Sequence, residues 1–207
     1  FQGEASALHN AQRTLIDELP PLAHILDSQT SPLPLVYGET GFRVVESEHV
    51  EGEKTLISPD MTTCEACLAD IDDQDNRRYH YPFTTCTHCG PRLSIITSLP
   101  YDRATTTMRE FPMCTQCEEE YTNPDDRRFH AQPISCPHCG PTLWCTDANG
   151  AVLAETRTDA LALDPGKFDE LVLKVQNAWE SGAVVAVKGI GGFHLMCAAE
   201  NEEAVEK

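Results

Sequence analysis

The chain has 207 residues and a formal net charge of −18, because 33 acidic side chains face only 15 basic ones. No apolar run reaches the roughly 18 residues of a transmembrane helix, so no membrane association is expected. The acidity also opposes non-specific nucleic-acid binding, which needs Lys and Arg against phosphates. Residues 1–30 show no basic-then-apolar leader, so we expect no signal peptide and a cytoplasmic location. Ten Cys then predict metal sites rather than disulfides, since the cytosol keeps thiols reduced.

The N-terminal stretch predicts one helix and one strand. Apolar residues recur at helical spacing over 6–27, with Ser6 as a candidate N-cap and Pro20-Pro21 ending the helix. Residues 28–40 are polar and contain Pro, which is typical of a loop, and 41–47 is predicted to be a strand. One helix and one strand are too little for a domain, so we expect the chain to begin inside one. Residues 49–63 are predicted to link this stretch to the next region.

Eight Cys form four C-x2-C pairs, arranged as two sets with the same internal spacing. Each set follows the pattern C-x2-C-x18-C-x2-C, and the second repeats the first 50 residues later; the sets are Cys64, Cys67, Cys86, Cys89 and Cys114, Cys117, Cys136, Cys139. This spacing is typical of a zinc site. Four thiolates close the tetrahedron of the ion, whereas a catalytic zinc keeps one position open for water. The sequence therefore predicts two structural zinc ions.

Three alternatives to this interpretation remain open in the sequence. His88 or His138 could replace one Cys ligand, and a C-x2-C pair could instead form a disulfide. The pairs could also interleave, with the first and third sharing an ion, but the repeat favours sequential pairing because each unit then carries its own four sulfurs. Gly90 and Gly140 follow the last Cys of each set, where a positive φ would close the turn.

The repeat extends beyond the Cys residues into a segment midway between the pairs. Arg77-Arg78-Tyr79-His80 in the first unit corresponds to Arg127-Arg128-Phe129-His130 in the second. Paired Arg with an aromatic could contact an anion or a nucleotide. We favour a structural role, in which Arg neutralises the excess negative charge of a four-thiolate site and the aromatic fills a small core.

The C-terminal part predicts a hairpin, a helix and a second turn. Asn149-Gly150 between short apolar runs indicates a hairpin turn. Residues 167–181 have the pattern of an amphipathic helix, with Gly182 as its C-cap, and 183–187 is predicted to be a buried strand. The strand leads into Lys188-Gly189-Ile190-Gly191-Gly192-Phe193-His194, a turn that by itself is only weak support for an anion site. Another helix is expected from Asn201.

Taken together, these motifs resemble the HypF hydrogenase-maturation carbamoyltransferases. The doubled four-Cys pattern, Asp-Arg-Arg-Phe-His-Ala-Gln-Pro at 126–133 and Val-Lys-Gly-Ile-Gly-Gly-Phe-His-Leu at 187–195 carry the resemblance. It implies an α+β chain in which a small tandem zinc-finger module is flanked by a partial acylphosphatase-like (ferredoxin-like) domain and the start of a YrdC-like α/β domain. The implied boundaries are 1–48 for the acylphosphatase-like part, 64–93 and 114–143 for the fingers, 144–166 for a hairpin and linker, and 167–207 for the YrdC-like part.

The same resemblance implies the chemistry of the full protein. Such an enzyme uses carbamoyl phosphate and ATP to form carbamoyl adenylate, and then carbamoylates the C-terminal Cys of a HypE-like partner for the cyanide ligand of nickel–iron hydrogenase. It implies that the nucleotide pocket includes Lys188, Gly189, Gly191, Gly192 and His194. The catalytic residues of the acylphosphatase-like domain and the transferase domain would lie outside 1–207, so we expect this segment alone to be inactive. The rival hypothesis is a zinc-ribbon interaction module without catalytic activity.

Overall fold

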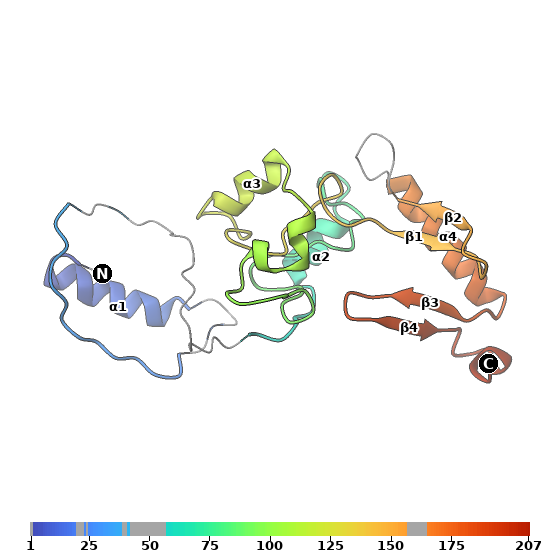
Figure 1. The fold of residues 1–207 in the computed structure, drawn as a ribbon, viewed down its shortest axis with the longest axis horizontal. Helices are drawn as coiled ribbons and strands as arrows, with labels where there is room; N and C mark the ends of the chain where they lie inside the picture. Colours follow the sequence, from blue (N-terminus) through green and yellow to red (C-terminus); the bar gives the residue numbers. More distant parts are fainter. Residues whose placement is uncertain (1, 20–22, 24, 39–40, 42–56, 157–164) are drawn as a thin grey trace. The chain divides into compact units, whose positions relative to one another are not determined.

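The computed structural model describes residues 2–19, 23, 25–38, 41, 57–156 and 165–207. It divides into two compact units, Phe1–Glu48 and His49–Lys207, which are described separately. The described residues form helices of 4 to 16 residues, two short 3-10 helices and two antiparallel hairpins, in agreement with the predicted α+β class (Figure 1). No helix among the described residues is long and apolar enough to cross a membrane.

The described residues of the first unit form one helix, α1 (Ala5–Asp17). Its N-cap is Glu4, whose backbone is extended, so the prediction of Ser6 as the cap is wrong: Ser6 already lies inside the helix. The Gln2 side chain donates to the carbonyl of Val36 and accepts from its N–H, which fastens the following loop. Pro20-Pro21 and most of the strand predicted over 41–47 lie outside the described residues.

Each finger of the second unit begins with a short helix directly after the first Cys of its set. These helices are α2 (Glu65–Asp72) and α3 (Thr115–Thr122), with Cys64 and Cys114 as their N-caps. The buried apolar residues around them are few and are mostly the Cys themselves, with Ala131 and Ile134 added in the second finger. Because this apolar core is so small, we expect metal binding to supply most of the free energy that folds each finger.

The segment between the fingers is folded rather than extended. It contains the 3-10 helices η1 (Arg103–Thr105) and η2 (Thr107–Glu110). Arg103 donates hydrogen bonds to the carbonyls of Gln132, Ile134 and Phe111, at 2.7–2.8 Å. One guanidinium therefore fixes this segment to the second finger.

The hairpin after the fingers has the predicted turn. Strands β1 (Trp144–Thr146) and β2 (Val152–Glu155) pair antiparallel around Gly150, which has φ +86°. Helix α4 (Pro165–Glu180) packs against β2 (Figure 1). Gly182 follows two residues after the end of the helix; its φ of +77° and its N–H bond to the carbonyl of Trp179 confirm the predicted cap. Residues 157–164 of the predicted linker lie outside the described part.

The chain then forms a second antiparallel hairpin, with β3 (Val185–Lys188) beside β4 (Phe193–Met196). The prediction of a buried strand over 183–187 is wrong, because Val184 is 40 % and Val187 36 % exposed. Among the described residues β3 pairs with β4 alone, so the outer edge of each strand is unpaired, and all four residues of β4 are exposed. The predicted final helix is present as α5 (Glu202–Val205), which Asn201 caps by accepting from the N–H of Ala204.

Candidate metal centres

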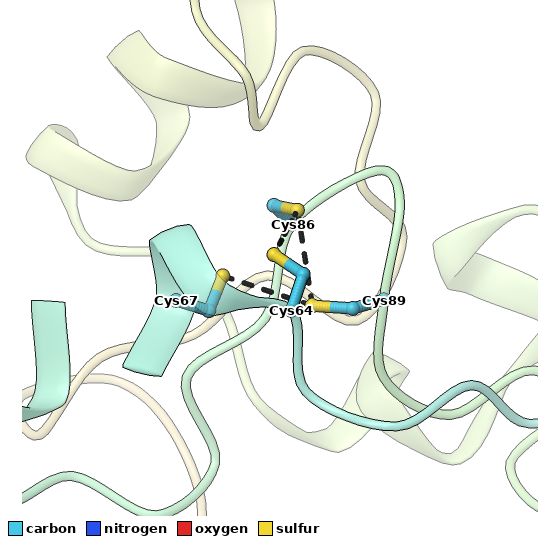
Figure 2. A group of neighbouring side chains, drawn as sticks. All are labelled: Cys64, Cys67, Cys86 and Cys89. Carbon is cyan, nitrogen blue, oxygen red and sulfur yellow. Dashed lines mark hydrogen bonds between the residues drawn. The ribbon is translucent and has the colours of Figure 1, made fainter. Parts of the chain in front are cut away.

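The four sulfurs of the first finger converge on one point (Figure 2). The Sγ–Sγ distances are 3.7 Å between Cys64 and Cys86, 3.8 Å between Cys86 and Cys89, and 3.7 Å between Cys67 and Cys89. All four sulfurs lie within 4.8 Å of one another. The first Cys pair comes from the start of α2 and the second from a tight loop, so two distant segments meet here.

The second finger repeats this geometry. Its Sγ–Sγ distances are 3.7 Å for Cys114 and Cys136, 3.7 Å for Cys136 and Cys139, and 3.6 Å for Cys117 and Cys139. These four sulfurs also lie within 4.8 Å of one another. The clusters pair the Cys residues sequentially rather than in an interleaved way.

The spacing of the sulfurs fits a tetrahedral zinc ion. A Zn–S bond of about 2.3 Å places neighbouring ligand sulfurs about 3.8 Å apart, which matches the observed distances. A disulfide needs an S–S bond of about 2.05 Å, and all ten Cys are free thiols. In the described part of the chain, the groups able to hold a metal consist of Cys alone, so His88 and His138 are not among the clustered ligands.

Local backbone structure explains why these Cys converge. Cys64 and Cys114 are the N-cap residues of α2 and α3, so the first turn of each helix brings Cys67 and Cys117 to the same side as the cap. In each second pair, the N–H of the later Cys bonds to the carbonyl of the earlier one. Gly90 has the expected positive φ of +86°, but Gly140 does not. Gly140 is instead required by space, since a Cβ there would overlap the hydroxyl of Tyr81.

The Arg pair of each finger contacts the metal cluster of the other finger. Arg77 lies 3.4 Å from the sulfur of Cys117 and 2.6 Å from Glu120. Arg78, which is only 1 % exposed, forms a two-pronged pair with Glu120 at 2.5 and 3.0 Å. Its Nε also donates to the carbonyl of Ser135. The first finger thus supplies the cations that surround the second cluster.

The Arg pair of the second finger, 50 residues later, makes the equivalent contacts to the first finger. Arg127 donates to the sulfur of Cys67 at 3.0 Å and pairs with Asp70, as Arg128 also does. The Nε of Arg128 donates to the carbonyl of Thr85, the counterpart of Ser135. The two fingers are therefore joined by a near-symmetric interface: the Arg pair of each finger contacts the Cys cluster and the acidic residue of the other.

A left-handed turn positions each Arg pair. His80 and His130 have φ of 55° and 51°, and their N–H groups bond to the carbonyls of Ile71 and Tyr121 at the ends of α2 and α3. His is one of the residues that tolerate this conformation. The His of the repeat is therefore explained by the backbone that follows the Arg pair.

The exchanged charges shift the pKa values of the acidic partners. Burial acts to raise the pKa of Glu120, but the hydrogen bond and charge of Arg78, and then those of Arg77, outweigh it and lower the pKa from 4.5. Burial is likewise outweighed at Asp70, where Arg128 and Arg127 lower the pKa from 3.8. Both carboxylates are therefore held ionised next to the guanidinium groups.

The sequence favours a structural role for the Arg repeat but does not reveal its acidic partners. The contacts support the structural interpretation, with one difference: each Arg pair serves the opposite cluster rather than its own. Asp70 and Glu120 were missed, although both are acidic and 50 residues apart, so a full comparison of the repeats could have found them. Cys145 and Cys197 are free, partly buried and outside both clusters.

The residues predicted to bind a nucleotide lie at the turn between β3 and β4. The N–H of Gly189 donates to the carbonyl of Gly192 at 2.7 Å, which closes a hairpin turn. The Nζ of Lys188 lies 5.2 Å from the ring centre of Phe193. A Cβ on Gly189 would lie 3.3 Å from Nε2 of His194, so that side chain folds over the turn. Gly191 is exposed at its tip.

Known protein families match both the zinc fingers and the C-terminal segment of the chain. A family model described as "HypF finger" matches residues 63–96 and 113–146. The carbamoyltransferase HypF of Synechocystis is 49 % identical over 205 residues, and HypF2 of Cupriavidus necator is 45 % identical over all 207. The chain belongs to the HypF family. A second family model, Sua5/YciO/YrdC, described as "Telomere recombination", matches residues 177–207, within the YrdC-like part.

The solved HypF structures agree with this assignment. A full-length HypF in the phosphate- and nucleotide-bound form superposes with a TM-score of 0.82 at 40 % identity, covering 99 % of this chain. HypF of T. kodakarensis gives a TM-score of 0.74 at 35 % identity, again over 99 % of this chain. The chain spans only about a quarter of the length of its relatives. It covers 25 % of the full-length HypF structure and 24 % of the T. kodakarensis structure. It covers 25 % of the Synechocystis protein and 24 % of the C. necator protein.

We predict that removing one ligand empties only its own metal centre. In Cys86→Ala, the first cluster loses one of four sulfurs, while the second keeps all of its ligands. The purified variant should hold one zinc ion and the unaltered chain two, as measured by elemental mass spectrometry. Cys145→Ala is the matched control and should hold two. A Cys86→Ala variant that holds no zinc, or still holds two, would contradict independent ligand sets.

We also predict that Glu120→Gln destabilises the fingers because it removes the charge that Arg77 and Arg78 share. The free energy of unfolding should fall by about 1.5–3 kcal/mol in urea denaturation at neutral pH. Because the pKa of Glu120 is lowered in the folded chain, this contribution is present above pH 4.5 and lost as the pH falls below it.

Glu119→Gln is the matched control, since Glu119 is exposed on the same helix. Its free energy of unfolding should stay within about 0.5 kcal/mol of the unaltered chain. Equal effects of the two substitutions would show that the cross-finger pair adds nothing to stability.

Proposed function

We propose that this chain is the part of a carbamoyltransferase that holds two structural zinc ions and contributes to a nucleotide pocket. In the full protein, carbamoyl phosphate and ATP yield carbamoyl adenylate, and the carbamoyl group passes to the C-terminal Cys of a HypE-like partner, where it becomes the cyanide ligand of nickel–iron hydrogenase. The observation that carries this proposal is the match of the whole chain to proteins named carbamoyltransferase HypF.

The role assigned to the fingers is structural. Each cluster offers four sulfurs at tetrahedral spacing and no further ligand, which suits an ion that holds a fold together rather than one that activates water. Zinc bound there would draw α2 and α3 onto their loops and keep the reciprocal Arg contacts in place. The fingers would then act as a rigid spacer between the acylphosphatase-like segment at 1–48 and the YrdC-like segment at 167–207.

The role assigned to the β3–β4 turn is binding of the nucleotide phosphates. Lys188 supplies a positive charge at the end of β3, and the three glycines let backbone N–H groups approach an anion without a Cβ in the way. A Cβ at Gly192 would meet no atom within 4 Å, so the backbone is open to a ligand on that side. A solved relative bound to phosphate and nucleotide, which aligns over this segment, supports this role.

The proposal predicts that Lys188→Ala impairs adenylate formation in the full-length protein that contains this chain. Carbamoyl-phosphate-dependent exchange of pyrophosphate into ATP should fall on the order of 10²-fold, as for the loss of one preorganised charge contact. Lys174→Ala is the matched control, because Lys174 lies on α4, away from the β3–β4 turn, and forms an ion pair with Glu170 at 3.5 Å. Unchanged exchange in Lys188→Ala, or no exchange in the unaltered protein, would contradict the proposal.

A further inference from the structure

The two metal clusters have the same four-Cys ligand set but differ in how far the surrounding chain shields it from solvent. Cys89 is fully buried, whereas Cys139, its counterpart 50 residues later, is partly exposed. The other three positions have the same burial class in both clusters. The difference between the centres is therefore concentrated at the last sulfur of each set.

An open cavity lies at the exposed side of the second cluster. Its volume is about 390 Å³, and its wall is formed by the end of the inter-finger segment and by the turn that carries the second Cys pair. Two cluster residues, Cys114 and Cys139, belong to its lining, together with Phe111, His138 and Thr142. A small molecule in this cavity would contact two of the four ligands directly.

An arginine covers the corresponding turn in the first finger. The guanidinium of Arg92 donates to the carbonyls of Thr87, Cys89 and Pro91, at 2.7–3.0 Å. The residue 50 positions later is Thr142, which lines the cavity instead. The long planar side chain that closes one turn is thus absent from the other.

Two further contacts hold the first turn and are missing from the second. Thr85 donates its hydroxyl to the carbonyl of Cys89 at 2.7 Å, but its counterpart Ser135 is hydrogen-bonded to Tyr81 and the carbonyl of Phe83. Thr87 also donates its N–H and hydroxyl to the opposite finger. Its counterpart is Pro137, which has neither group to donate.

We propose that the second finger is an exchangeable zinc centre, reached through this cavity by a small zinc-binding molecule, while the first finger is closed. Exchange needs an incoming donor to approach zinc as a further ligand. The Cys139 thiolate then leaves and takes a proton from solvent, so no oxidant or reductant is required. The inference rests on the zinc loading proposed above for both fingers.

The test is zinc transfer from the full chain to an excess of the chromophoric chelator 4-(2-pyridylazo)resorcinol. The zinc content is measured first and should be two ions per chain. We expect two phases, with one ion released at least about tenfold faster, a barrier difference of about 1.4 kcal/mol. Iodoacetamide added during the fast phase should label Cys114 and Cys139 before any Cys of the first finger, as read by peptide mass spectrometry.

A matched pair of substitutions tests the role of the arginine over the turn, by removing it from the first finger and adding it to the second. Arg92→Thr should open the first centre and speed the slow phase about tenfold or more, while Thr142→Arg should slow the fast phase. The unaltered chain carries the test even if one variant fails to fold. Two ions released at one rate, or labelling of the first finger first, would overturn the inference. Fewer than two ions per chain would instead contradict the zinc loading itself.

Discussion

The structure of the zinc module depends on the exchange of arginines between its two fingers. Four thiolates outweigh the charge of one zinc ion, so each occupied centre would be an anion inside a small, poorly hydrated core. Arg78 and Arg128, which are 1 % and 5 % exposed, bring the opposite charge from the other finger. Buried guanidinium groups are stable only when paired and hydrogen-bonded, and each of these two finds a carboxylate and a backbone carbonyl across the interface.

This arrangement makes two small domains into one unit. Neither finger has an apolar core of useful size, since the buried cluster of the first finger consists of its own ligands and that of the second adds only Ala131 and Ile134. Metal binding can order each finger's helix and loop, but the Arg contacts exist only when both fingers are folded. Tyr81 adds to the coupling, because it is fully buried and its hydroxyl bonds to Ser135 and the carbonyl of Pro141 in the second finger. The same Tyr81 explains why residue 140 is Gly.

The sequence predicted what local spacing determines and failed where contacts between distant segments decide. The Cys spacing led to the right grouping of sulfurs, and Asn149-Gly150 and Gly182 marked turns that the structure contains. The sequence could not show which cluster each Arg pair contacts, because a repeat does not tell whether a side chain contacts its own unit or the other one. Burial of 183–187 was also wrong, since an apolar run shows the preference of a strand and not the neighbours that would cover it. The cover that Arg92 provides depends on a contact geometry that spacing does not encode.

The most direct test of the crossed contacts is to ask which centre responds to an Arg substitution. Zinc-loaded full chains carrying Arg78→Met or Arg128→Met are treated with iodoacetamide, and the labelling rate of each cluster is read by peptide mass spectrometry. We predict that Arg78→Met speeds labelling of Cys117 and its cluster, and that Arg128→Met speeds labelling of Cys67 and its cluster. Faster labelling in the finger that carries the substitution, with the opposite finger unchanged, would contradict it.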